Sequence, residues 1–492
     1  MASGLGNVLV VGLGKSGLAA ARFCIAHLGG GVDDAFAVES LTVYGGASSD
    51  AAVAFSAEAA GHGIEVILDC EDVRGSYDLA IVSPGISVNS AFFKNAAAAS
   101  REIVCEPELA FRYAPERWIG ITGTNGKTTT TTLTAHLLET AGLGGIACGN
   151  IGLPCIEAAS GRTDGSYLVA ELSSFQLESM PTFSPRAAVL LNITPDHIEW
   201  HGSLEAYAAA KERIFANLGA SGYAIVDCTA ENTRALAGRL TARGIALIAV
   251  GGPAGFADAY HPLGEPGSVD RGGCAHLADG VLTVVLDGTE HRLVAAGELA
   301  IRGDHNVQNA LSASAAALVA GIADADLVAG LRSYRPVEHR VEPCGEVAGV
   351  RFYNDSKATN TDAAIKALTA FPGQRVWMLL GGHDKGTDLG ELVSACIRSC
   401  TGVICFGEAA ERFLAAFADA DAEGAGLSVL EAPHMREAFA TACDAASAGD
   451  VVLLSPACSS FDEFSSYEER GILFKQLVSD LRGDGAGEVS HG

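Results

Sequence analysis

A glycine-rich loop followed by lysine and threonine is the feature that most constrains this chain. Residues 119–132 read I-G-I-T-G-T-N-G-K-T-T-T-T-T, with a buried-strand pattern before the loop and a helical pattern, Thr128–Ala141, after it. A strand that passes through such a loop into a helix directs backbone N–H groups and the positive helix end at phosphate. The chain is therefore predicted to contain an α/β unit that binds a nucleotide.

The loop departs from the usual pattern at one position. G-x-x-x-x-G-K-[ST] expects a glycine five residues before Gly126, where this chain has Ile121. We expect a tighter loop in which Gly123 makes the close backbone approach to phosphate. Lys127 is expected to reach the outer phosphates, and the hydroxyl of Thr128 is expected to bind Mg²⁺. A purely structural glycine turn is the alternative, but it does not account for Gly, Lys and Thr in succession after a strand.

An earlier glycine cluster, Gly12–Gly17, follows the strand pattern Asn7–Val11 and precedes the helical run Leu18–His27. It fits G-x-G-x-x-G, which is typical of dinucleotide-binding domains. A nicotinamide site also needs an acidic residue at the end of the second strand, and that strand, Leu41–Tyr44, ends here in Gly45-Gly46. The cluster is therefore a weak indication of NAD, and it is compatible with a different diphosphate.

The length of the chain predicts its number of domains, and its net charge limits the ligands that it can bind. A chain of 492 residues predicts about three domains. The formal net charge of -27 argues against binding of nucleic acid, because a phosphate backbone requires clustered Lys and Arg. No signal peptide or membrane-spanning apolar run is evident, and the 13 cysteines contain no C-x-x-C pair. We expect a cytoplasmic protein with no membrane insertion and with free cysteines.

Alternating strand and helix patterns predict three α/β domains whose parallel sheets are covered on both faces. We expect a Rossmann-like domain over residues 1–113, a central P-loop ATPase-like domain over 114–334, and a Rossmann-like third domain over 335–492. Gly251–Gly273 is expected to be a loop, and the tail Gly483–Gly492 is expected to be disordered. Further strands are expected at Glu65–Leu68, Leu79–Val82, Trp118–Thr122, Tyr167–Leu172, Ala187–Ile193, Val350–Tyr353, Arg375–Leu380, Thr401–Phe406 and Val451–Leu454.

Five stretches give the chain a resemblance to the Mur ligase family over nearly its whole length. They are G-T-N-G-K-T at 123–128, G-N-I-G-L-P at 149–154, E-L-S-S-F-Q-L-E at 171–178, N-D-S-K-A-T-N at 354–360 and S-P-A-C-S-S-F-D-E-F at 455–464. The third and fifth stretches, with G-L-G-K-S-G at 12–17, resemble the branch of the family that adds D-glutamate. This implies that ATP phosphorylates the carboxylate of UDP-N-acetylmuramoyl-L-alanine and that D-glutamate attacks the acyl phosphate, in peptidoglycan precursor synthesis. We expect the enzyme to act as a monomer.

The resemblance also implies roles for individual residues. The implied catalytic residues are Lys127, Glu171, His197 and Lys211. The implied ATP contacts are Gly123, Thr124, Asn125, Gly126, Lys127, Thr128, Thr129, Asn306, Asn309, Arg340 and Asp355. The implied contacts to the UDP substrate are Ser16, Asn150 and Ser173, and those to D-glutamate are Lys357, Thr359, Lys385, Ser460 and Tyr467. Two Mg²⁺ ions are implied, with ligands from Thr128, Glu171, His197 and Lys211.

Without the family resemblance, two of these residues would be assigned ordinary structural roles. His197 is typical of a solvent-facing loop histidine, and Lys211 is typical of a lysine on an amphipathic helix that begins near Ser203. In relatives with the A-K-x-R-I arrangement the lysine carries a carbamate. The resemblance therefore implies a carbamylated Lys211, in which a cation has become an anionic oxygen ligand suited to Mg²⁺.

Other functions stay open on the sequence. Folylpolyglutamate synthases share the loop and the third-domain plan, but they lack a UDP-binding first domain of this kind. A Mur ligase for another amino acid, a nucleotide-dependent switch and an NAD oxidoreductase are further alternatives. Two positions depart from the resemblance: Gly45-Gly46 lacks the acidic residue that can follow the second strand in relatives, and Tyr467 stands where an aromatic such as Phe borders the D-glutamate pocket.

Overall fold

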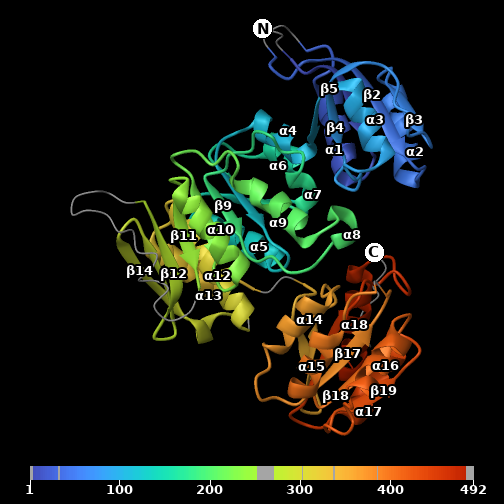
Figure 1. The fold of residues 1–492 in the computed structure, drawn as a ribbon, viewed down its shortest axis with the longest axis vertical. Coiled ribbons are helices and arrows are strands. Elements are labelled where there is room, and N and C mark those ends of the chain that lie inside the picture. The colour runs from blue at the N-terminus through green and yellow to red at the C-terminus, as the bar shows by residue number, and fades with distance from the viewer. Residues whose placement is uncertain are drawn as a thin grey trace. The chain divides into compact units, whose positions relative to one another are not determined.

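Three sheets rich in parallel strands, with helices packed against them, confirm the predicted α/β fold class (Figure 1). The structure is a computed structural model that describes residues 4–30, 34–251, 271–301, 303–335, 338–384 and 386–483. Its contacts divide the chain into two compact units, one of Met1–Glu298 with Gln308–Ser333 and one of Leu299–Val307 with Tyr334–Gly492. The domain boundaries expected from the sequence stay predictions.

The first sheet has five parallel strands in the order β3-β2-β1-β4-β5. The chain moves from β1 to one side of the sheet and then returns to β4 on the other side. Ligands bind at such a switch point, beyond the carboxyl ends of the strands. The elements are β1 (Gly6–Val11), α1 (Lys15–Ala26), β2 (Val38–Gly46), α2 (Asp50–Ala60), β3 (Glu65–Leu68), β4 (Tyr77–Val82), α3 (Ala91–Ala99), β5 (Ser100–Cys105) and α4 (Glu106–Tyr113).

The second sheet has nine strands in the order β14-β13-β12-β11-β10-β9-β6-β8-β7, parallel from β7 to β12 and antiparallel from β12 to β14. Its switch point is at β6, between β8 and β9. Its strands are β6 (Trp118–Thr122), β7 (Gly145–Gly149), β8 (Tyr167–Glu171), β9 (Ala187–Leu190), β10 (Tyr223–Asp227), β11 (Ala246–Val250), β12 (Gly272–Ala278), β13 (Val281–Leu286) and β14 (Thr289–Ala295). The helices of this region are α5 (Lys127–Thr140), α6 (Cys155–Gly161), α7 (Ser174–Leu177), α8 (Ile198–His201), α9 (Leu204–Glu212), α10 (Glu231–Ala242), α12 (Asp304–Val319) and α13 (Asp324–Ser333), with short 3-10 turns at Arg213–Phe215 and Ala296–Glu298.

The third sheet has six strands in the order β15-β16-β20-β17-β18-β19, and only the β15–β16 pair among these is antiparallel. Its strands are β15 (Glu342–Val347), β16 (Val350–Asn354), β17 (Val376–Gly381), β18 (Gly402–Phe406), β19 (Ser428–Glu431) and β20 (Val451–Ala457). Its helices are α14 (Thr361–Leu368), α15 (Gly390–Ser399), α16 (Ala410–Asp419), α17 (Met435–Ala445) and α18 (Tyr467–Arg482). Within the described ranges, none of the helices combines the length and the apolar character that crossing a bilayer requires.

Several expected boundaries are wrong. α1 begins at Lys15 rather than Leu18, and β9 ends at Leu190 rather than Ile193. Gly272 and Gly273 belong to β12 rather than to a loop, because their bare backbones pair with β11 where a side chain would strike neighbouring carbonyl groups. The strands β10 to β15 had no counterpart among the expected elements. Residues 252–270 of the expected loop and 484–492 of the expected tail lie outside the described residues.

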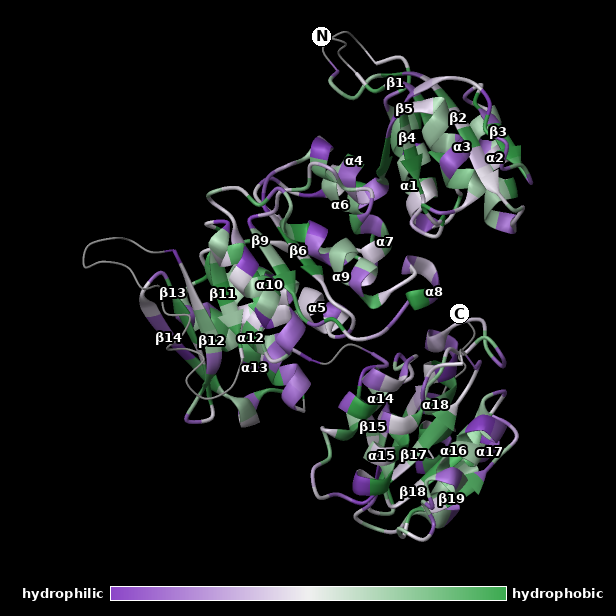
Figure 2. Cartoon of the chain, viewed as in Figure 1, coloured by the Kyte–Doolittle hydropathy of each residue, from purple (hydrophilic) through white to green (hydrophobic). Residues whose placement is uncertain are grey.

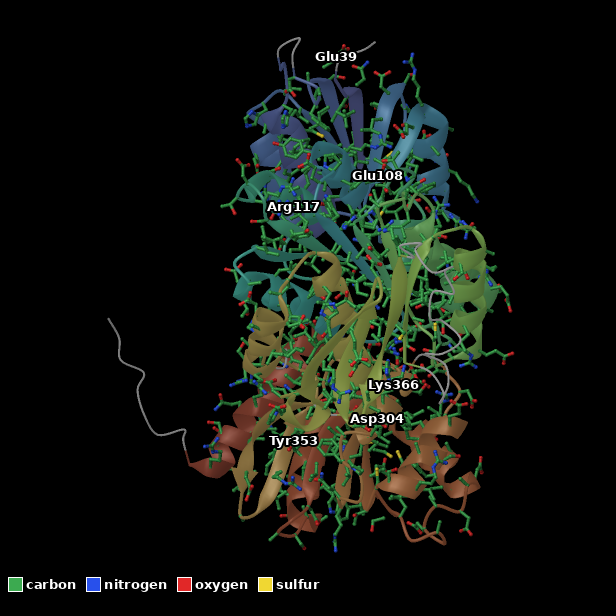
Figure 3. The ribbon with its side chains drawn as sticks, turned by 90° about the vertical axis from the view of Figure 1, so that its left-hand side faces the viewer. Glu39, Glu108, Arg117, Asp304, Tyr353 and Lys366 are labelled. Carbon is green, nitrogen blue, oxygen red and sulfur yellow. The ribbon has the colours of Figure 1, made fainter. Side chains whose placement is uncertain are left out.

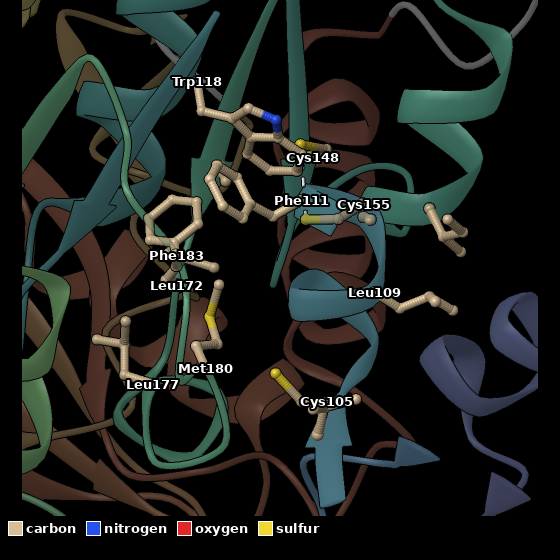
Figure 4. Packing of buried hydrophobic residues seen from close by; sticks show 14 of the residues in the cluster. Cys105, Leu109, Phe111, Trp118, Cys148, Cys155, Leu172, Leu177, Met180 and Phe183 are labelled. Carbon is tan, nitrogen blue, oxygen red and sulfur yellow. Dashed lines mark hydrogen bonds between the residues drawn. The ribbon is translucent and has the colours of Figure 1, made fainter. Parts of the chain in front are cut away.

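Apolar strands buried on both faces form the cores of the sheets, and Figure 2 shows hydrophobic residues running along them. At the start of β6, the ring of Trp118 lies 6.0 Å from that of Phe111 on α4 and 5.8 Å from that of Phe183 (Figure 4). The Trp118 indole N–H donates to the carbonyl oxygen of Ala114 at 2.6 Å. These contacts fix α4 against the strand that leads into the glycine-rich loop.

Two glutamates are buried in the first turn of α4. Glu108 accepts hydrogen bonds from the Arg112 guanidinium at 2.9 Å and from the Thr182 hydroxyl at 2.5 Å. Glu106 accepts one from the Ile156 N–H at 2.5 Å, and its other oxygen has no partner among the described residues. Burial raises the pKa of Glu106 to about 8 against the opposing effect of that hydrogen bond. Figure 3 labels Glu108 within the structure and Glu39 at its periphery.

We expect Glu106→Gln to change stability in a pH-dependent way. The pKa of Glu106 in the folded protein, about 8, lies above the ordinary value of 4.5, so folding favours the neutral acid. The stabilisation that this provides is complete below pH 4.5 and is lost as pH rises through 8. The variant stays neutral, so its free energy of unfolding should rise relative to the parent by up to about 1.4 kcal/mol per pH unit between those limits.

Urea unfolding followed by circular dichroism measures this difference at several pH values. The exposed Glu39→Gln variant is the control and should follow the parent at every pH. A constant difference between Glu106→Gln and the parent across the range would show that Glu106 is already ionised in the folded protein.

Candidate active site

The glycine-rich loop joins β6 to α5 and is shaped by two glycines in the left-handed region, Gly123 with φ 152 and Gly126 with φ 85. The N–H of Thr124 donates to the carbonyl oxygen of Asn192 at 2.8 Å. The N–H of Asn125 donates to the side-chain Oδ1 of Asn192 at 2.9 Å. The Asn192 amide donates back to the carbonyl oxygen of Asn125 at 3.0 Å. The sequence placed Asn192 inside a strand, and its role in shaping the loop was missed.

Two ammonium groups converge on the carbonyl oxygen of Gly123. Lys127 donates to it at 2.9 Å and to the carbonyl oxygen of Thr124 at 2.8 Å. Lys211, which is 2% exposed, donates to the Gly123 oxygen at 2.8 Å. Burial, and then the charge of Lys127, lower the pKa of Lys211 well below its ordinary value. Lys127 therefore gives the loop a local positive charge in a strongly acidic protein, and the Lys211 amine beside it is favoured in its neutral form.

Glu171 ends β8 beside this loop and is buried. It accepts a hydrogen bond from the Thr128 hydroxyl at 2.7 Å and one from the Asn150 amide at 3.0 Å. Thr129 follows on α5 and is also buried. The structure thus brings together Thr128, Glu171 and Asn150, which the sequence assigned to nucleotide, metal and UDP substrate.

The oxygens of Thr128 and Glu171 suit Mg²⁺, which takes few protein oxygens and completes its shell with phosphate and water. In the described part of the chain, no group of three or more His, Cys, Asp and Glu residues is arranged to hold a metal ion without other ligands. A magnesium ion at this position would therefore depend on bound nucleotide for its remaining ligands.

His197 lies in the left-handed region with φ 51, directly before α8, and its side chain is 47% exposed. Its ring lies 6.2 Å from that of Tyr207, and the Lys211 ammonium lies 4.5 Å from the same tyrosine ring. The hydroxyls of Tyr207 and Thr124 share a hydrogen bond of 3.2 Å. Tyr207 therefore joins two expected metal ligands to the loop. Tyr207 was not among the residues predicted for the site, although its place four residues before Lys211 puts both on one helix face.

A cavity of about 620 Å³ opens at the switch point of the first sheet. Ser16 lies in its wall, in the first turn of α1, whose N-cap Gly14 has no side chain to cap the helix. Lys15 donates to the carbonyl oxygen of Gly152, in the loop that also carries Asn150. The cavity is lined by Gly12, Leu13, Gly14, Lys15, Ser16, Gly45, Gly46, Ala47, Ser49, Glu71, Ser83, Pro84, Gly85, Ile86 and Phe92. Its size and uncapped helix end fit a nucleoside diphosphate.

Ser173 has a structural role at the N-terminus of α7. It forms a capping box in which its hydroxyl accepts from the N–H of Gln176 at 3.3 Å and the Gln176 side chain accepts from the N–H of Ser173 at 2.8 Å. This motif satisfies helix-end donors and accounts for a serine here without a ligand. Contact between Ser173 and the UDP substrate stays a prediction.

In the second unit, Asp355 is buried just after β16. Its carboxylate accepts from the Ser455 hydroxyl at 2.7 Å and from the N–H of Val341 at 3.2 Å. Burial raises the pKa of Asp355 to about 7, while Ser455 and the nearby charge of Arg340 act in the opposite direction. In its ionised form, the Asp355 carboxylate can accept hydrogen bonds from neutral hydroxyl groups such as those of ribose.

Two asparagines that the sequence assigned to adenine lie three residues apart on α12, and both are buried. Residues at this spacing are neighbours on a helix surface. A Cβ added to Gly126 would collide with Oδ1 of Asn309. Asn309 therefore packs directly against the glycine-rich loop, and Asn306 precedes it by one turn.

Of the residues assigned to D-glutamate, Lys357, Thr359 and Ser460 lie in two loops of the second unit, and Tyr467 begins α18. The Lys357 ammonium lies 5.1 Å from the ring of Tyr467, and Thr359 follows in the same turn. Ser460 is buried beyond the end of β20. Lys385 lies outside the described residues.

Arg470 on α18 connects these two loops and was missed from the sequence. Its fully buried guanidinium donates to the Ser356 hydroxyl at 2.9 Å and to the carbonyl oxygens of Ser356 and Cys458 at 2.9 and 3.0 Å. The loops that carry Lys357 and Ser460 are therefore held together by one cation.

Comparison with known proteins gives consistent matches. Residues 121–317 match the Mur ligase middle domain, and residues 339–458 match the Mur ligase glutamate ligase domain. A UDP-N-acetylmuramoylalanine--D-glutamate ligase of Acidobacterium capsulatum is 38% identical over 482 residues, which cover 98% of this chain and 97% of the relative. The enzyme of the same name from Pelotomaculum thermopropionicum is 37% identical, covering 97% of this chain and 98% of the relative.

Solved structures match the fold. A pseudomurein peptide ligase type C from Methanothermus fervidus aligns with a TM-score of 0.55 at 17% identity, over 91% of this chain and 96% of its own. A UDP-N-acetylmuramate-alanine ligase from Thermotoga maritima aligns with a TM-score of 0.55 at 17% identity, over 96% of this chain and 99% of its own. At this identity the likeness concerns the fold.

Gly126→Ala is expected to weaken nucleotide binding, because its Cβ would displace Asn309 in addition to straining a left-handed backbone. Gly142→Ala is the matched control, since Gly142 has φ +71 and open space around it. Both variants should lose about 1 kcal/mol or more of stability, but only Gly126→Ala should weaken ADP binding, by at least about tenfold. Equal ADP affinities by calorimetry would contradict this account of the loop.

Proposed function

The chain belongs to the Mur ligase family and ligates D-glutamate to UDP-N-acetylmuramoyl-L-alanine with ATP, and we propose that the buried cluster around Gly123 carries out the phosphoryl transfer. The observation that supports this most directly is the convergence of Lys127 and Lys211 on one carbonyl oxygen, beside Glu171 and the N-terminus of α5. Such a site attracts triphosphate even though the protein as a whole repels anions.

The reaction needs activation because a carboxylate is a poor electrophile. The substrate carboxylate takes the γ-phosphoryl group from ATP, which yields an acyl phosphate and ADP. The neutral amine of D-glutamate then attacks the acyl carbon, phosphate leaves with the bonding electron pair, and the nitrogen loses one proton, which the released phosphate can accept, as the amide forms. Catalysis of phosphoryl transfer is mostly positioning and charge stabilisation. A cation about 4 Å from a developing charge contributes roughly 4 kcal/mol at an effective dielectric constant near 20.

Lys127 and the N–H groups at the N-terminus of α5 hold the phosphates in this proposal, while the N–H groups of Thr124 and Asn125 stay bonded to Asn192 and shape the loop. Thr128 and Glu171 would hold one Mg²⁺, and His197 with a carbamylated Lys211 would hold a second. Magnesium would neutralise phosphate charge and orient the transferred group. Asn150, fixed by its hydrogen bond to Glu171, would place the UDP substrate next to the reacting phosphate.

The other residues keep the roles that the family resemblance implies. Ser16 lies in the wall of the first-sheet cavity and would meet the diphosphate of the UDP substrate. Asn306 and Asn309 would contact adenine, Asp355 the ribose and Arg340 a phosphate. Lys357, Thr359, Ser460, Tyr467 and Lys385 would bind D-glutamate. We also propose a cytoplasmic monomer, in keeping with the lack of disulfide bonds among the residues that the structure describes.

ADP release in the presence of UDP-N-acetylmuramoyl-L-alanine is expected to depend strongly on D-glutamate. L-Glutamate, L-alanine, L-lysine and diaminopimelate should support little release, because the acceptor pocket has to place one amine in line with the acyl carbon. Lys127→Ala should lower kcat by about 10²-fold or more with every acceptor while the fold is kept. Faster turnover with L-lysine or diaminopimelate, or near-parent kcat in Lys127→Ala, would contradict the assignment.

Carbamylation of Lys211 is supported by its environment. Burial and the charge of Lys127 favour the neutral amine, which is the form that attacks CO₂ to give a carbamate and a proton. The modification would replace repulsion between two ammonium groups by attraction between Lys127 and an anion. The anionic oxygens would also suit Mg²⁺, which an unmodified ammonium would repel.

Chemical rescue tests the carbamate. Lys211→Ala should lose most activity and should regain part of it with acetate or formate, whose carboxylate can occupy the space of the carbamate. The parent enzyme should also lose activity when bicarbonate is removed or when low pH protonates the amine. Parent-like activity of Lys211→Ala without added carboxylate would disprove the role.

A further inference from the structure

The single turn α8 depends on contacts with other elements. It has four residues, and an isolated helix of this length is not stable in water. It is bounded by His197 and Gly202, with φ 51 and 82, both in the left-handed region. For His197, a side-chain-bearing residue, that backbone conformation is strained. Contacts around α8 must therefore hold His197 in place.

His201, the last residue of α8, provides such contacts through a side chain that is 1% exposed. Its Nε2 lies 3.0 Å from the hydroxyl of Ser174, and its ring is stacked on Phe175 with centroids 5.5 Å apart. The ring centroid of Tyr207 lies 5.3 Å away, and the Glu178 carboxylate lies 3.6 Å from Nδ1. One buried imidazole therefore joins α7, α8 and α9, which lie together in Figure 1.

These contacts lead directly to the proposed metal ligands. The N–H groups of Trp200 and His201 both donate to the carbonyl oxygen of His197 at 3.1 Å, so a single hydrogen-bonded turn connects His201 with His197. On the other side, the ring of Tyr207 lies under the Lys211 ammonium. The ring of Trp200 packs on Phe175 at 4.2 Å and closes the cluster.

We propose that His201 is a positioning residue for the metal ligands, because its imidazole fixes α8 on α7 and α9 and so holds His197 and Lys211 in place. The inference rests on the proposed function, in which those two residues bind the second Mg²⁺. His201 itself touches neither substrate nor metal in this scheme. Outer contacts of this kind orient ligands and commonly change metal affinity by about 10–100-fold when removed.

Binding of Mn²⁺ in place of Mg²⁺ tests this without relying on turnover. The metal is titrated into enzyme with ADP, and bound Mn²⁺ is measured by electron paramagnetic resonance. His201→Ala should weaken the second Mn²⁺ by about 10–100-fold and lower kcat. The KM for D-glutamate should stay unchanged, because its proposed residues belong to the other unit. His201→Gln keeps a polar contact to Ser174 but loses the ring stacking, and it should weaken Mn²⁺ by a smaller factor.

Two reference variants make the result decisive. Phe183→Leu removes packing in the core near Trp118 and should lower the thermal midpoint without affecting Mn²⁺ affinity. If His201→Ala, or His201→Gln where the alanine variant does not fold, binds Mn²⁺ like Phe183→Leu, the role of His201 is overturned. His197→Ala separates the two proposals. If it retains both Mn²⁺ ions at parent affinity, the proposed ligand role of His197 fails, irrespective of His201.

Discussion

The carbonyl oxygen of Gly123 is the point on which the nucleotide-binding region depends. It accepts hydrogen bonds from Lys127 and from the buried Lys211, so two lysine side chains are held within reach of each other and of Glu171. This arrangement requires glycine at position 123, whose carbonyl oxygen accepts both hydrogen bonds. It also requires a strand that ends in a carboxylate beside the loop. In a protein with a net charge of -27, it provides a local region that attracts anions.

Both glycine-rich loops follow the strand at which their sheet reverses its order. β1 leads into the loop that lines the first cavity, and β6 leads into the loop that carries Lys127. The contact from Lys15 to the carbonyl oxygen of Gly152 connects the first loop with the segment of Asn150, which in turn reaches Glu171. A chain of polar contacts thus runs from the cavity that fits a diphosphate to the carboxylate beside the phosphate loop.

Much of this could be predicted because the chemistry lies in contiguous motifs. The spacing of Gly126, Lys127 and Thr128 specified the loop, and the position of Glu171 at a strand end predicted its meeting with Thr128. The supporting residues could not be predicted in the same way. Asn192, His201 and Arg470 act through contacts between distant segments, and nothing adjacent in sequence marks them. The strands β12 and β15 were missed because their sequences, glycine-rich at the start of β12 and charged in β15, carry no apolar repeat.

The aromatic cluster around α8 also gives the protein an internal optical reporter. Of the three tryptophans, Trp118 lies in the core at the start of β6 and Trp377 lies in the third sheet, whereas Trp200 belongs to the turn between His197 and His201. Its indole packs against Phe175, so small rotations of that turn alter the surroundings of the chromophore. Fluorescence of a protein in which only Trp200 is retained would therefore report local order at this turn separately from folding of the sheets.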